Sequence, residues 1–348
     1  MPMLPAPGPD IDLAALGCFL RAHSLDAPDN LTLEQMTGGQ SNPTYRVHGA
    51  DQPLVLRKKP PGALLPSAHA IDREFRIMQA LSATQVPVPK VYFYCDDVSI
   101  AGTPFYIMEF LDGRVFIDPA LPDMTPSQRT AIYLEMNRVI AALHCIDPAT
   151  VGLADYGRAG NYFARQIARW TRQYDVSKTS SIPAMDALIA WLPAHIPPGE
   201  VASIVHGDYR IDNLVFHKSD PRITGVLDWE LSTLGHPLAD LSYHCMSWHI
   251  PASLWRGIGG LDLDALGIPG EADYLRHYCN ATGADALEHW DFYLAYNLFR
   301  IASILQGVAK RALGGNAAAA DAEAMGRKAP PLAELGWTFA QRYAASRS

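Results

Sequence analysis

The residues best suited to chemistry lie between positions 204 and 230. Asp208 follows a short apolar run, and Asn213 comes five positions later, just before a second apolar run. Twenty positions after Asp208, Asp228 ends a third apolar run. A carboxylate can take the proton of an acceptor hydroxyl, and amide and carboxylate oxygens are the hard ligands that Mg²⁺ prefers. Because phosphoryl transfer depends on positioning and on neutralising charge, this set predicts that reaction.

Each of these residues also has an ordinary structural interpretation. An acid at the end of a strand, such as Asp228 taken alone, is most often a turn or capping residue. The combination is rarer, because Asp208 also follows His206-Gly207 and has its asparagine at the spacing of a kinase catalytic loop. Arg210 lies where protein kinases carry a lysine. It either neutralises the migrating phosphoryl group or orients the loop, and both roles stay open.

The segment from His206 to Asn213, with Asp228-Trp229-Glu230, resembles the H-G-D-x-x-x-x-N motif of the aminoglycoside phosphotransferase and choline kinase superfamily. A longer match is to one subgroup, the kinase-like domain found alone in bacteria and fused to acyl-CoA dehydrogenases in animals. The segments that carry this match are Leu56 to Gly62, Ala68-His69, Asp72 to Glu74, Val86 to Pro89, Arg165-Gln166, Arg169-Trp170 and Leu227 to Gly235. The resemblance departs from the family at His236, where an aspartate is usual. We expect that change to affect local packing rather than chemistry.

The resemblance implies an α+β, protein-kinase-like fold of two lobes, and the predicted elements fit it. The N-terminal lobe, 1–111, should be β-rich and bind the nucleotide, and the C-terminal lobe, 112–348, should be mainly helical and bind the acceptor. Apolar periodicity and turn residues place strands at 33–37, 45–48, 54–58, 90–94 and 105–110, and helices at 11–22 and 68–81. Later helices are expected at 126–144, 162–174, 185–192, 238–248, 272–280, 287–313 and 318–343, around a β-rich stretch at 204–229.

A glycine-containing turn, residues 37–42, lies between the first two predicted strands. Alone it is an ordinary hairpin turn. In the register of the family it becomes the phosphate lid, because glycine lets backbone N–H groups approach phosphate oxygens. The resemblance then implies that Gly38, Gly39 and Ser41 contact the nucleotide.

A kinase needs a cation on its third strand, paired with a carboxylate on the following helix. Alternation puts Val55, Arg57 and Lys59 on one face of the predicted strand 54–58 and its continuation. The resemblance indicates Arg57, where many relatives have lysine, and Lys59 remains the alternative. Glu74 is the expected partner. The alternative is that both are solvated surface charges.

The strand predicted at 105–110 resembles the one that enters the kinase hinge. In that fold the adenine ring hydrogen-bonds to the hinge backbone. The resemblance therefore implies that Glu109, Phe110 and Leu111 supply the adenine contacts, without indicating which atoms do so.

Three arginines share one face of the helix predicted at 162–174. Arg165, Arg169 and Arg172 are separated by four and three positions. Such a face suits an anionic acceptor that carries a carboxylate, a phosphate or a CoA group, rather than a polycation. The resemblance implies a hydroxylated acyl chain, such as a hydroxy acid or hydroxyacyl-CoA. A solvated helix face remains the plain alternative.

Composition narrows the expected partners. The net charge is −8 over 348 residues, so nucleic acid is not an expected partner. Five widely spread cysteines without a C-x-x-C pair favour a reducing compartment. The first ten residues lack a signal-peptide pattern, and no apolar run of about 18 residues occurs. We therefore expect a cytoplasmic protein without a membrane partner, and the sequence leaves its oligomeric state open.

These features predict a kinase that uses ATP and Mg²⁺ and phosphorylates a small hydroxylated acceptor. Asp208 and Arg210 are the predicted catalytic residues, and Asn213 and Asp228 the predicted metal ligands. The alternatives are an antibiotic phosphotransferase, an ATPase without an acceptor, and a pseudokinase that binds or regulates. The three intact motif residues count against a pseudokinase, since loss of a metal ligand is the simplest sign of one.

Overall fold

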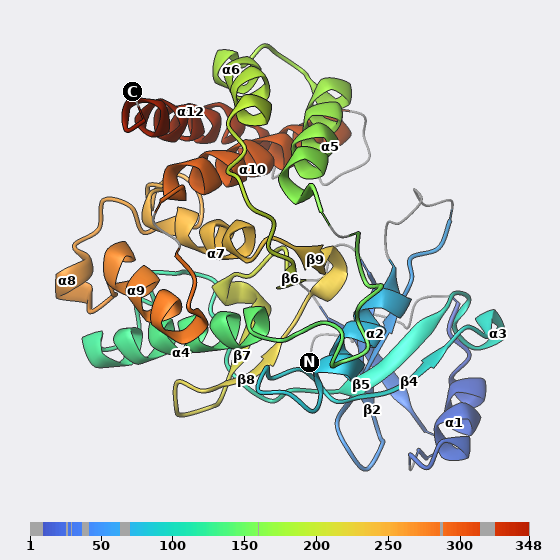
Figure 1. The fold of residues 1–348 in the computed structure, drawn as a ribbon. Coiled ribbons are helices and arrows are strands. Elements are labelled where there is room, and N and C mark those ends of the chain that lie inside the picture. Colours follow the sequence, from blue (N-terminus) through green and yellow to red (C-terminus); the bar gives the residue numbers. More distant parts are fainter. Residues whose placement is uncertain are drawn as a thin grey trace. The chain divides into compact units, whose positions relative to one another are not determined.

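The computed structural model describes residues 10–25, 27–28, 30–36, 42–62, 70–158, 160–285, 288–313 and 324–347 (Figure 1). The chain divides into two compact units. The first unit comprises Met1–Val115 and Asn213–Ser232, and the second comprises Phe116–Asp212 and Thr233–Ser348. The lobes predicted from the sequence, 1–111 and 112–348, remain a proposal about functional organisation.

A five-stranded antiparallel sheet forms the centre of the first unit, with strand order β1-β2-β3-β5-β4. The strands are β1 (Thr32–Gln35), β2 (Thr44–His48), β3 (Leu54–Lys58), β4 (Val91–Cys95) and β5 (Phe105–Glu109). The register places Arg57 of β3 opposite Thr44 on β2 and opposite Tyr106 on β5. Strand pairing therefore places one polar side chain on each side of this arginine, Thr44 on one side and Tyr106 on the other.

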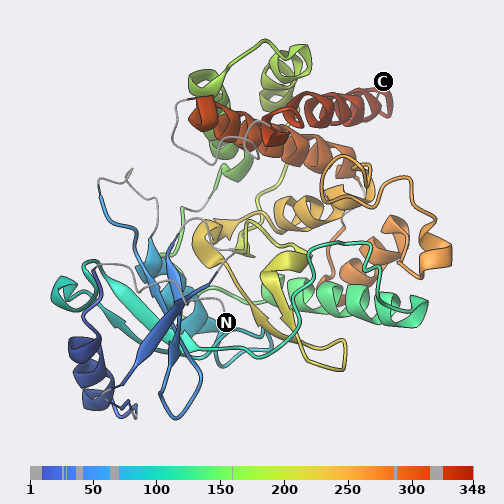
Figure 2. The same cartoon turned by 180° about the vertical axis from the view of Figure 1, so that it is seen from behind.

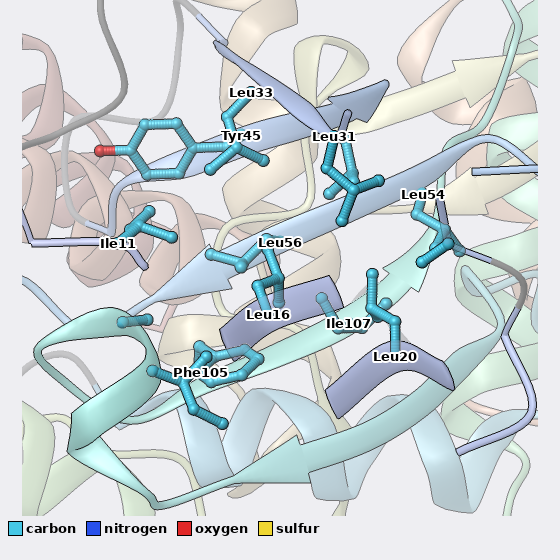
Figure 3. Close-up of a cluster of buried hydrophobic side chains, with 14 of the residues drawn as sticks. Ile11, Leu16, Leu20, Leu31, Leu33, Tyr45, Leu54, Leu56, Phe105 and Ile107 are labelled. Carbon is cyan, nitrogen blue, oxygen red and sulfur yellow. The ribbon is translucent and has the colours of Figure 1, made fainter. Parts of the chain in front are cut away.

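One face of the sheet is covered by helix α1 (Leu13–Ala22), which Asp12 caps through the N–H groups of Ala14 and Ala15. Figure 3 shows Leu16 and Leu20 of this helix beneath the side chains of β3 and β5. Leu54 and Leu56 belong to this core. Because successive side chains of a strand point to opposite faces, Arg57 lies on the other face.

That other face carries helix α2 (Ile71–Leu81), which contacts β4 and β5. The hairpin of β7 (Leu214–Phe216) and β8 (Ile223–Val226) belongs to the same unit. Arg114 and Phe216 exchange two backbone hydrogen bonds of 2.8 Å. A Cβ atom on Gly113 would lie 2.3 Å from the Phe216 carbonyl oxygen, so only glycine fits at this approach.

The second unit is mainly helical. Its helices are α4 (Pro126–His144), α5 (Tyr162–Ser177), α6 (Pro183–Trp191), α7 (Pro237–Cys245), α8 (Leu263–Leu266), α9 (Glu271–Thr282), α10 (Trp290–Leu313) and α12 (Ala329–Ala345). Both Figure 1 and Figure 2 show α5 and α6 beside α10 and α12. A two-stranded ribbon joins β6 (Ser203–Val205) to β9 (Thr233–Gly235).

The structure confirms an α+β chain with a β-rich N-terminal part and a mainly helical remainder. It corrects several boundaries. Of the predicted helix 318–343, residues 318–323 lie outside the described part of the chain, and α12 begins at Ala329 with prolines in its first turn, the position where their missing N–H is tolerated. The stretch 204–229 contains parts of two separate ribbons. Helices α3 (Val98–Ala101) and α8 were not predicted, since one turn leaves no periodicity to detect.

Among the described residues, no helix is both long and apolar enough to cross a membrane.

Candidate active site

Arg57 is the centre of a buried charged cluster in the first unit. Its side chain is on the α2 face of β3, and the residue is only 8% exposed. Its Nε atom lies 2.8 Å from Oε2 of Glu74, and its Nη2 donates to Oδ1 of Asp228 at 3.1 Å. Burial disfavours the charged form, but the two carboxylates outweigh it and raise the pKa of Arg57 above its usual range. The arginine therefore stays charged and holds two acids from separate parts of the chain.

Glu74 of α2 accepts hydrogen bonds from more than Arg57. Asn42 donates to its Oε1 at 2.7 Å, and the Tyr106 hydroxyl donates to its Oε2 at 3.0 Å. Burial raises the pKa of Glu74, and the neighbouring guanidinium of Arg57 opposes that rise. Burial and Glu74 raise the pKa of Tyr106 well above its usual value, so the phenol donates as a neutral group. The sequence predicted the Arg57–Glu74 pair and missed the asparagine and the tyrosine.

Lys58 and Lys59 lie apart from this cluster. The Lys58 ammonium donates to the carbonyl of Ala101 on the other face of the sheet. Lys59 hydrogen-bonds through its backbone, with its N–H donating to the carbonyl of Pro104 at 3.0 Å. Of the cations in this segment, Arg57 is the one that the structure joins to Glu74.

Asp228 and Asn213 lie at the open end of the β7–β8 hairpin. The N–H of Leu227 donates to the carbonyl of Asn213 at 2.8 Å, which places the two predicted metal ligands beside one another in the ladder. Asp228 has a φ of 64°, a left-handed conformation that is uncommon for a residue with a side chain. Its side chain is 34% exposed although Arg57 holds one oxygen. A strained backbone at a partly exposed acid is a frequent property of functional sites.

The predicted adenine-binding residues continue β5. The N–H groups of Glu109 and Phe110 donate to the carbonyls of Lys90 and Pro53, each at 2.9 Å. Among the three predicted residues, Leu111 is therefore the remaining candidate for an N–H donor to adenine. The predicted lid residues Gly38, Gly39 and Ser41 lie outside the described part of the chain.

Asp208 lies in the second unit, in the loop that follows β6. Gly207 has a φ of 83°, which explains the glycine of the motif, and the N–H of Asp208 donates to Nδ1 of His206 at 3.1 Å. The Tyr243 hydroxyl donates to Oδ1 of Asp208 at 2.6 Å, and Nη2 of Arg210 donates to Oδ2 at 3.0 Å. Both oxygens of the predicted base thus have a fixed donor.

Asp240 of α7 anchors the backbone of the same loop. Its two oxygens accept from the N–H groups of His206 and Gly207 at 2.7 and 2.8 Å. His144 lies 3.2 Å from its Oδ2. Burial works to raise the pKa of Asp240, but His144 and the backbone donors outweigh burial and hold it below its usual value. The sequence offered no signal for this residue, because its partners are 33 and 34 positions away.

Arg210 also belongs to a second pair of charges. Asp212 lies 3.6 Å from Arg210 and 2.8 Å from Arg256, so it bridges two guanidinium groups. A pocket in this unit is lined by both arginines and by mostly apolar side chains. The apolar ones are Ile117, Pro119, Met136, Ile211, Met246, Ile250 and Trp255. Tyr243, the partner of Asp208, also lines it. Asp212 also lines the pocket, where it neutralises part of the charge of the two arginines.

The three arginines predicted to bind the acceptor lie on α5. Arg165 is partly buried, and its Nη2 donates to the carbonyl of Arg158 at 2.7 Å. Arg169 and Arg172 are exposed, and the Arg169 guanidinium lies 5.2 Å from the ring of Trp170. Among the contacts that the structure describes, none links these three arginines to the side chains of Arg210 or Arg256.

Comparison with known proteins places this geometry in a family. The model of the phosphotransferase enzyme family matches residues 32–296. A solved Ralstonia eutropha protein, provisionally described as an aminoglycoside phosphotransferase, is 53% identical. Its TM-score is 0.88, covering 95% of this chain and 98% of that one. An aminoglycoside phosphotransferase solved with AMP-PNP and hygromycin B has a TM-score of 0.58 at 16% identity, covering 92% and 98% of the two chains. Its likeness shows the fold alone.

Acyl-CoA dehydrogenase family member 10 of Mus musculus is 50% identical over 314 residues. The match covers 90% of this chain but 29% of that protein, so the chain spans less than a third of this relative. The fold is thus the two-lobed, kinase-like α+β fold of these solved structures. From the match over residues 32–296, the chain belongs to the phosphotransferase enzyme family.

Proposed function

We propose that this protein is a kinase that moves the γ-phosphoryl group of ATP to an alcohol group of a small molecule. One observation carries the proposal: a buried arginine is bound at once to the acid of α2 and to the acid that ends β8. A cation between these two acids is the arrangement by which kinases hold the α- and β-phosphates beside the metal-binding carboxylate. Arg57 then grips the phosphates, and Glu74 holds Arg57 in place.

Asn213 and Asp228 fit Mg²⁺ by chemistry and by location. Both offer oxygen atoms, the donors that this hard cation requires, and it commonly takes few protein ligands together with substrate phosphates. Arg57 holds Oδ1 of Asp228, and the partial exposure of that side chain leaves it reachable from solvent. When bound there, Mg²⁺ would supply charge neutralisation for the nucleotide phosphates. Among the described residues no group of three acidic, histidine or cysteine ligands occurs, which suits a metal that arrives with its nucleotide.

Asp208 is proposed to orient the acceptor hydroxyl and to take its proton. The new bond forms between the acceptor oxygen and the γ-phosphorus, and the bond from that phosphorus to the β–γ bridging oxygen breaks. ADP leaves with the electron pair, and the hydroxyl proton passes to the carboxylate of Asp208. Arg210, 3.0 Å from that carboxylate, either neutralises the migrating group or orients the loop. Leu111 is proposed as the N–H donor to adenine, with Gly38, Gly39 and Ser41 as the lid.

The acceptor is proposed to be anionic, a hydroxy acid or its CoA thioester. Support comes from the pocket beside Tyr243, which is lined by Arg210 and Arg256, by Asp212 that pairs with both, and by apolar side chains. The exposed α5 arginines Arg169 and Arg172, with Arg165, are proposed to attract the anion at longer range. The relatives that are acyl-CoA dehydrogenases suit an acyl acceptor. An antibiotic acceptor is the alternative, because hygromycin B is bound by a protein of the same fold.

Calorimetry with ATP, in the presence and absence of Mg²⁺, tests the first half of the proposal. Tight binding that requires Mg²⁺ is expected, and it should be lost in Asp228→Asn. A chain that binds no nucleotide with Mg²⁺ present would instead be a pseudokinase-like module. A screen of hydroxylated metabolites for ATP consumption tests the second half. Phosphate release that no added alcohol changes would indicate an ATPase, and aminoglycosides as the best substrates would overturn the anionic acceptor.

A further inference from the structure

A buried arginine on α10 lies beside the Asp208 loop. Arg300 is 5% exposed, and its Nη2 donates to the carbonyl of Gly207. Its guanidinium lies 4.7 Å from the ring of Tyr243 and 5.5 Å from the ring of Trp170. The structure describes two aromatic faces and a backbone carbonyl as contacts of this cation, and the Asp208 carboxylate acts on it electrostatically. Burying a charge is costly unless its surroundings compensate, so this arrangement calls for an explanation.

Tyr243 connects this cation to the predicted base. The residue is 3% exposed on α7, and its hydroxyl donates to Oδ1 of Asp208 at 2.6 Å. That distance is typical of a strong hydrogen bond to an ionised carboxylate. One face of the ring is covered by Arg300, so the ring cannot rotate away without breaking the cation–π contact. Arg300 thus touches the loop twice, directly at Gly207 and through the tyrosine at Asp208.

Charged and titratable groups approach Asp208 from each neighbouring element. Arg210 comes from its own loop, Tyr243 from α7 and Arg300 from α10, and Nδ1 of His206 accepts its backbone N–H. Arg210 shares its charge with Asp212. Arg300 interacts with Asp208 electrostatically, and Tyr243 lies in contact with both residues, so Arg300 also supports the direction of the hydrogen bond.

We propose that Tyr243 and Arg300 are positioning residues that hold the carboxylate of Asp208 in one orientation toward the acceptor. The inference rests on the proposed function, in which Asp208 receives the acceptor proton. Tyr243 and Arg210 each donate to one oxygen of Asp208, so the arrangement selects one direction of the carboxylate. That choice suits phosphoryl transfer, where positioning contributes more than covalent chemistry.

The test compares crystal structures of Tyr243→Phe with wild type and with a matched control, Tyr343→Phe. The phenyl ring that Tyr243→Phe introduces keeps the cation–π contact and removes only the hydrogen bond. Tyr343 of α12 is also buried, and its hydroxyl lies 2.8 Å from Nδ1 of His289. We expect Asp208 to adopt a second rotamer in Tyr243→Phe and to keep one in Tyr343→Phe. A single, unchanged Asp208 rotamer in Tyr243→Phe would overturn the inference.

Turnover of MgATP, with water or with an acceptor from the screen, gives the second measurement. Tyr243→Phe should lower kcat by about 10-fold to 100-fold, the value of a hydrogen bond to a charged group, with KM for ATP changed less than about 2-fold. Tyr343→Phe should leave both unchanged. A Tyr243→Phe enzyme with wild-type kcat would overturn the catalytic part of the inference.

Arg300 is tested by Arg300→Lys, which keeps a buried cation, and by Arg300→Met, which removes it. We expect Arg300→Lys to retain a larger share of kcat than Arg300→Met, and equal kcat values would contradict the role of the charge. If Arg300→Met does not fold, Tyr243→Phe and Arg300→Lys still decide the question. Failure of the proposed function has a different signature: Asp208→Asn would then leave turnover unchanged, while the rotamer comparison would still report on positioning.

Discussion

The Arg57 cluster of the first unit and the Asp208 cluster of the second unit each contain a buried arginine, Arg57 and Arg300, but the two arginines are stabilised differently. Arg57 is neutralised by two carboxylates, Glu74 and Asp228, one of which is partly exposed. Arg300 is buried against a ring and a carbonyl instead. An ion pair with an exposed acid can exchange partners when a charged ligand arrives. A cation that packs on an aromatic face has no charged partner to exchange. This arrangement suits a neighbouring carboxylate that must keep one orientation.

The largest effect should come from the base itself. Asp208→Asn keeps the shape and the acceptor oxygen for Tyr243, but it removes the group that takes the proton. We expect kcat to fall by about 10²–10⁴, the usual value of general-base catalysis, with ATP affinity unchanged in calorimetry. Asp228→Asn should instead weaken the Mg²⁺-dependent binding of ATP. If the two variants proved indistinguishable in both measurements, the division of roles between the clusters would be wrong.

The next effect concerns stability and separates the two acids of the Arg57 cluster. Arg57→Met leaves Glu74, which is 1% exposed, without its cation, and breaking a buried pair in this way costs about 3–5 kcal/mol. Glu74→Gln should cost less, because Arg57 keeps Asp228, and the amide oxygen can still accept from one of the two donors, Asn42 or Tyr106. Urea denaturation measures both free energies of unfolding. A larger loss in Glu74→Gln than in Arg57→Met would show that Asp228 does not compensate the arginine.

Local sequence predicted part of each cluster and missed the rest for a physical reason. Asp208 and Asn213 are five positions apart, and the family resemblance indicated Arg57 among the three residues that strand alternation put on one face, so local patterns were sufficient. The supports of Asp208 come from elsewhere: Tyr243 is 35 positions away, and Arg300 lies 93 positions from Gly207. Helical periodicity can indicate that a tyrosine or arginine lies on a buried face, but it does not indicate which loop the side chain contacts.

The same limit applies to the fold. Long periodic helices such as α4 were predicted at their observed bounds, 126–144, and the strand 54–58 matched β3. The β-rich stretch 204–229 could be predicted as strands, but its pairing could not. β6 pairs with β9, which lies beyond the predicted stretch, and encloses the β7–β8 hairpin in sequence. Pairing of short strands depends on contacts that the segments themselves do not encode.

A third effect sharpens the role of α7, the helix that carries Asp240 and Tyr243. Its N-cap is His236, the position where the chain departs from the family, and Nδ1 of that ring accepts the N–H of Leu238 at 3.2 Å. The ring packs against Phe163 and Tyr293. Burial, with the charge of His144, lowers the pKa of His236 to about 4. The change at His236 therefore affects local packing, and it also gives the buried ring a lowered pKa.

The sign of the pH effect follows from that shift. An unfolded histidine titrates near 6.5, so between about pH 6.5 and 4 the unfolded chain binds a proton that the folded chain refuses. Stability is full above this window and falls within it as pH decreases, by about 1–3 kcal/mol for a ring that is partly exposed. His236→Asn keeps a capping oxygen and should remove this part of the slope. Urea denaturation at pH 7, 6 and 5 measures it, and parallel slopes in both proteins would contradict the assignment.

The smallest effect decides between the two sets of arginines proposed for the acceptor. Arg169 is exposed on α5, so Arg169→Gln should change the free energy of unfolding by less than about 0.5 kcal/mol. Arg256→Gln removes a guanidinium 2.8 Å from Asp212 and keeps a hydrogen-bonding side chain in the pocket. If the pocket binds the anionic group directly, Arg256→Gln should raise the acceptor KM by about 10-fold at any ionic strength. Arg169→Gln should raise it by about 2-fold, and only at low salt, because a solvated charge acts through a screened field.

KM for ATP should stay constant in both variants. A salt-independent rise in Arg169→Gln, with none in Arg256→Gln, would move the binding site from the pocket to α5.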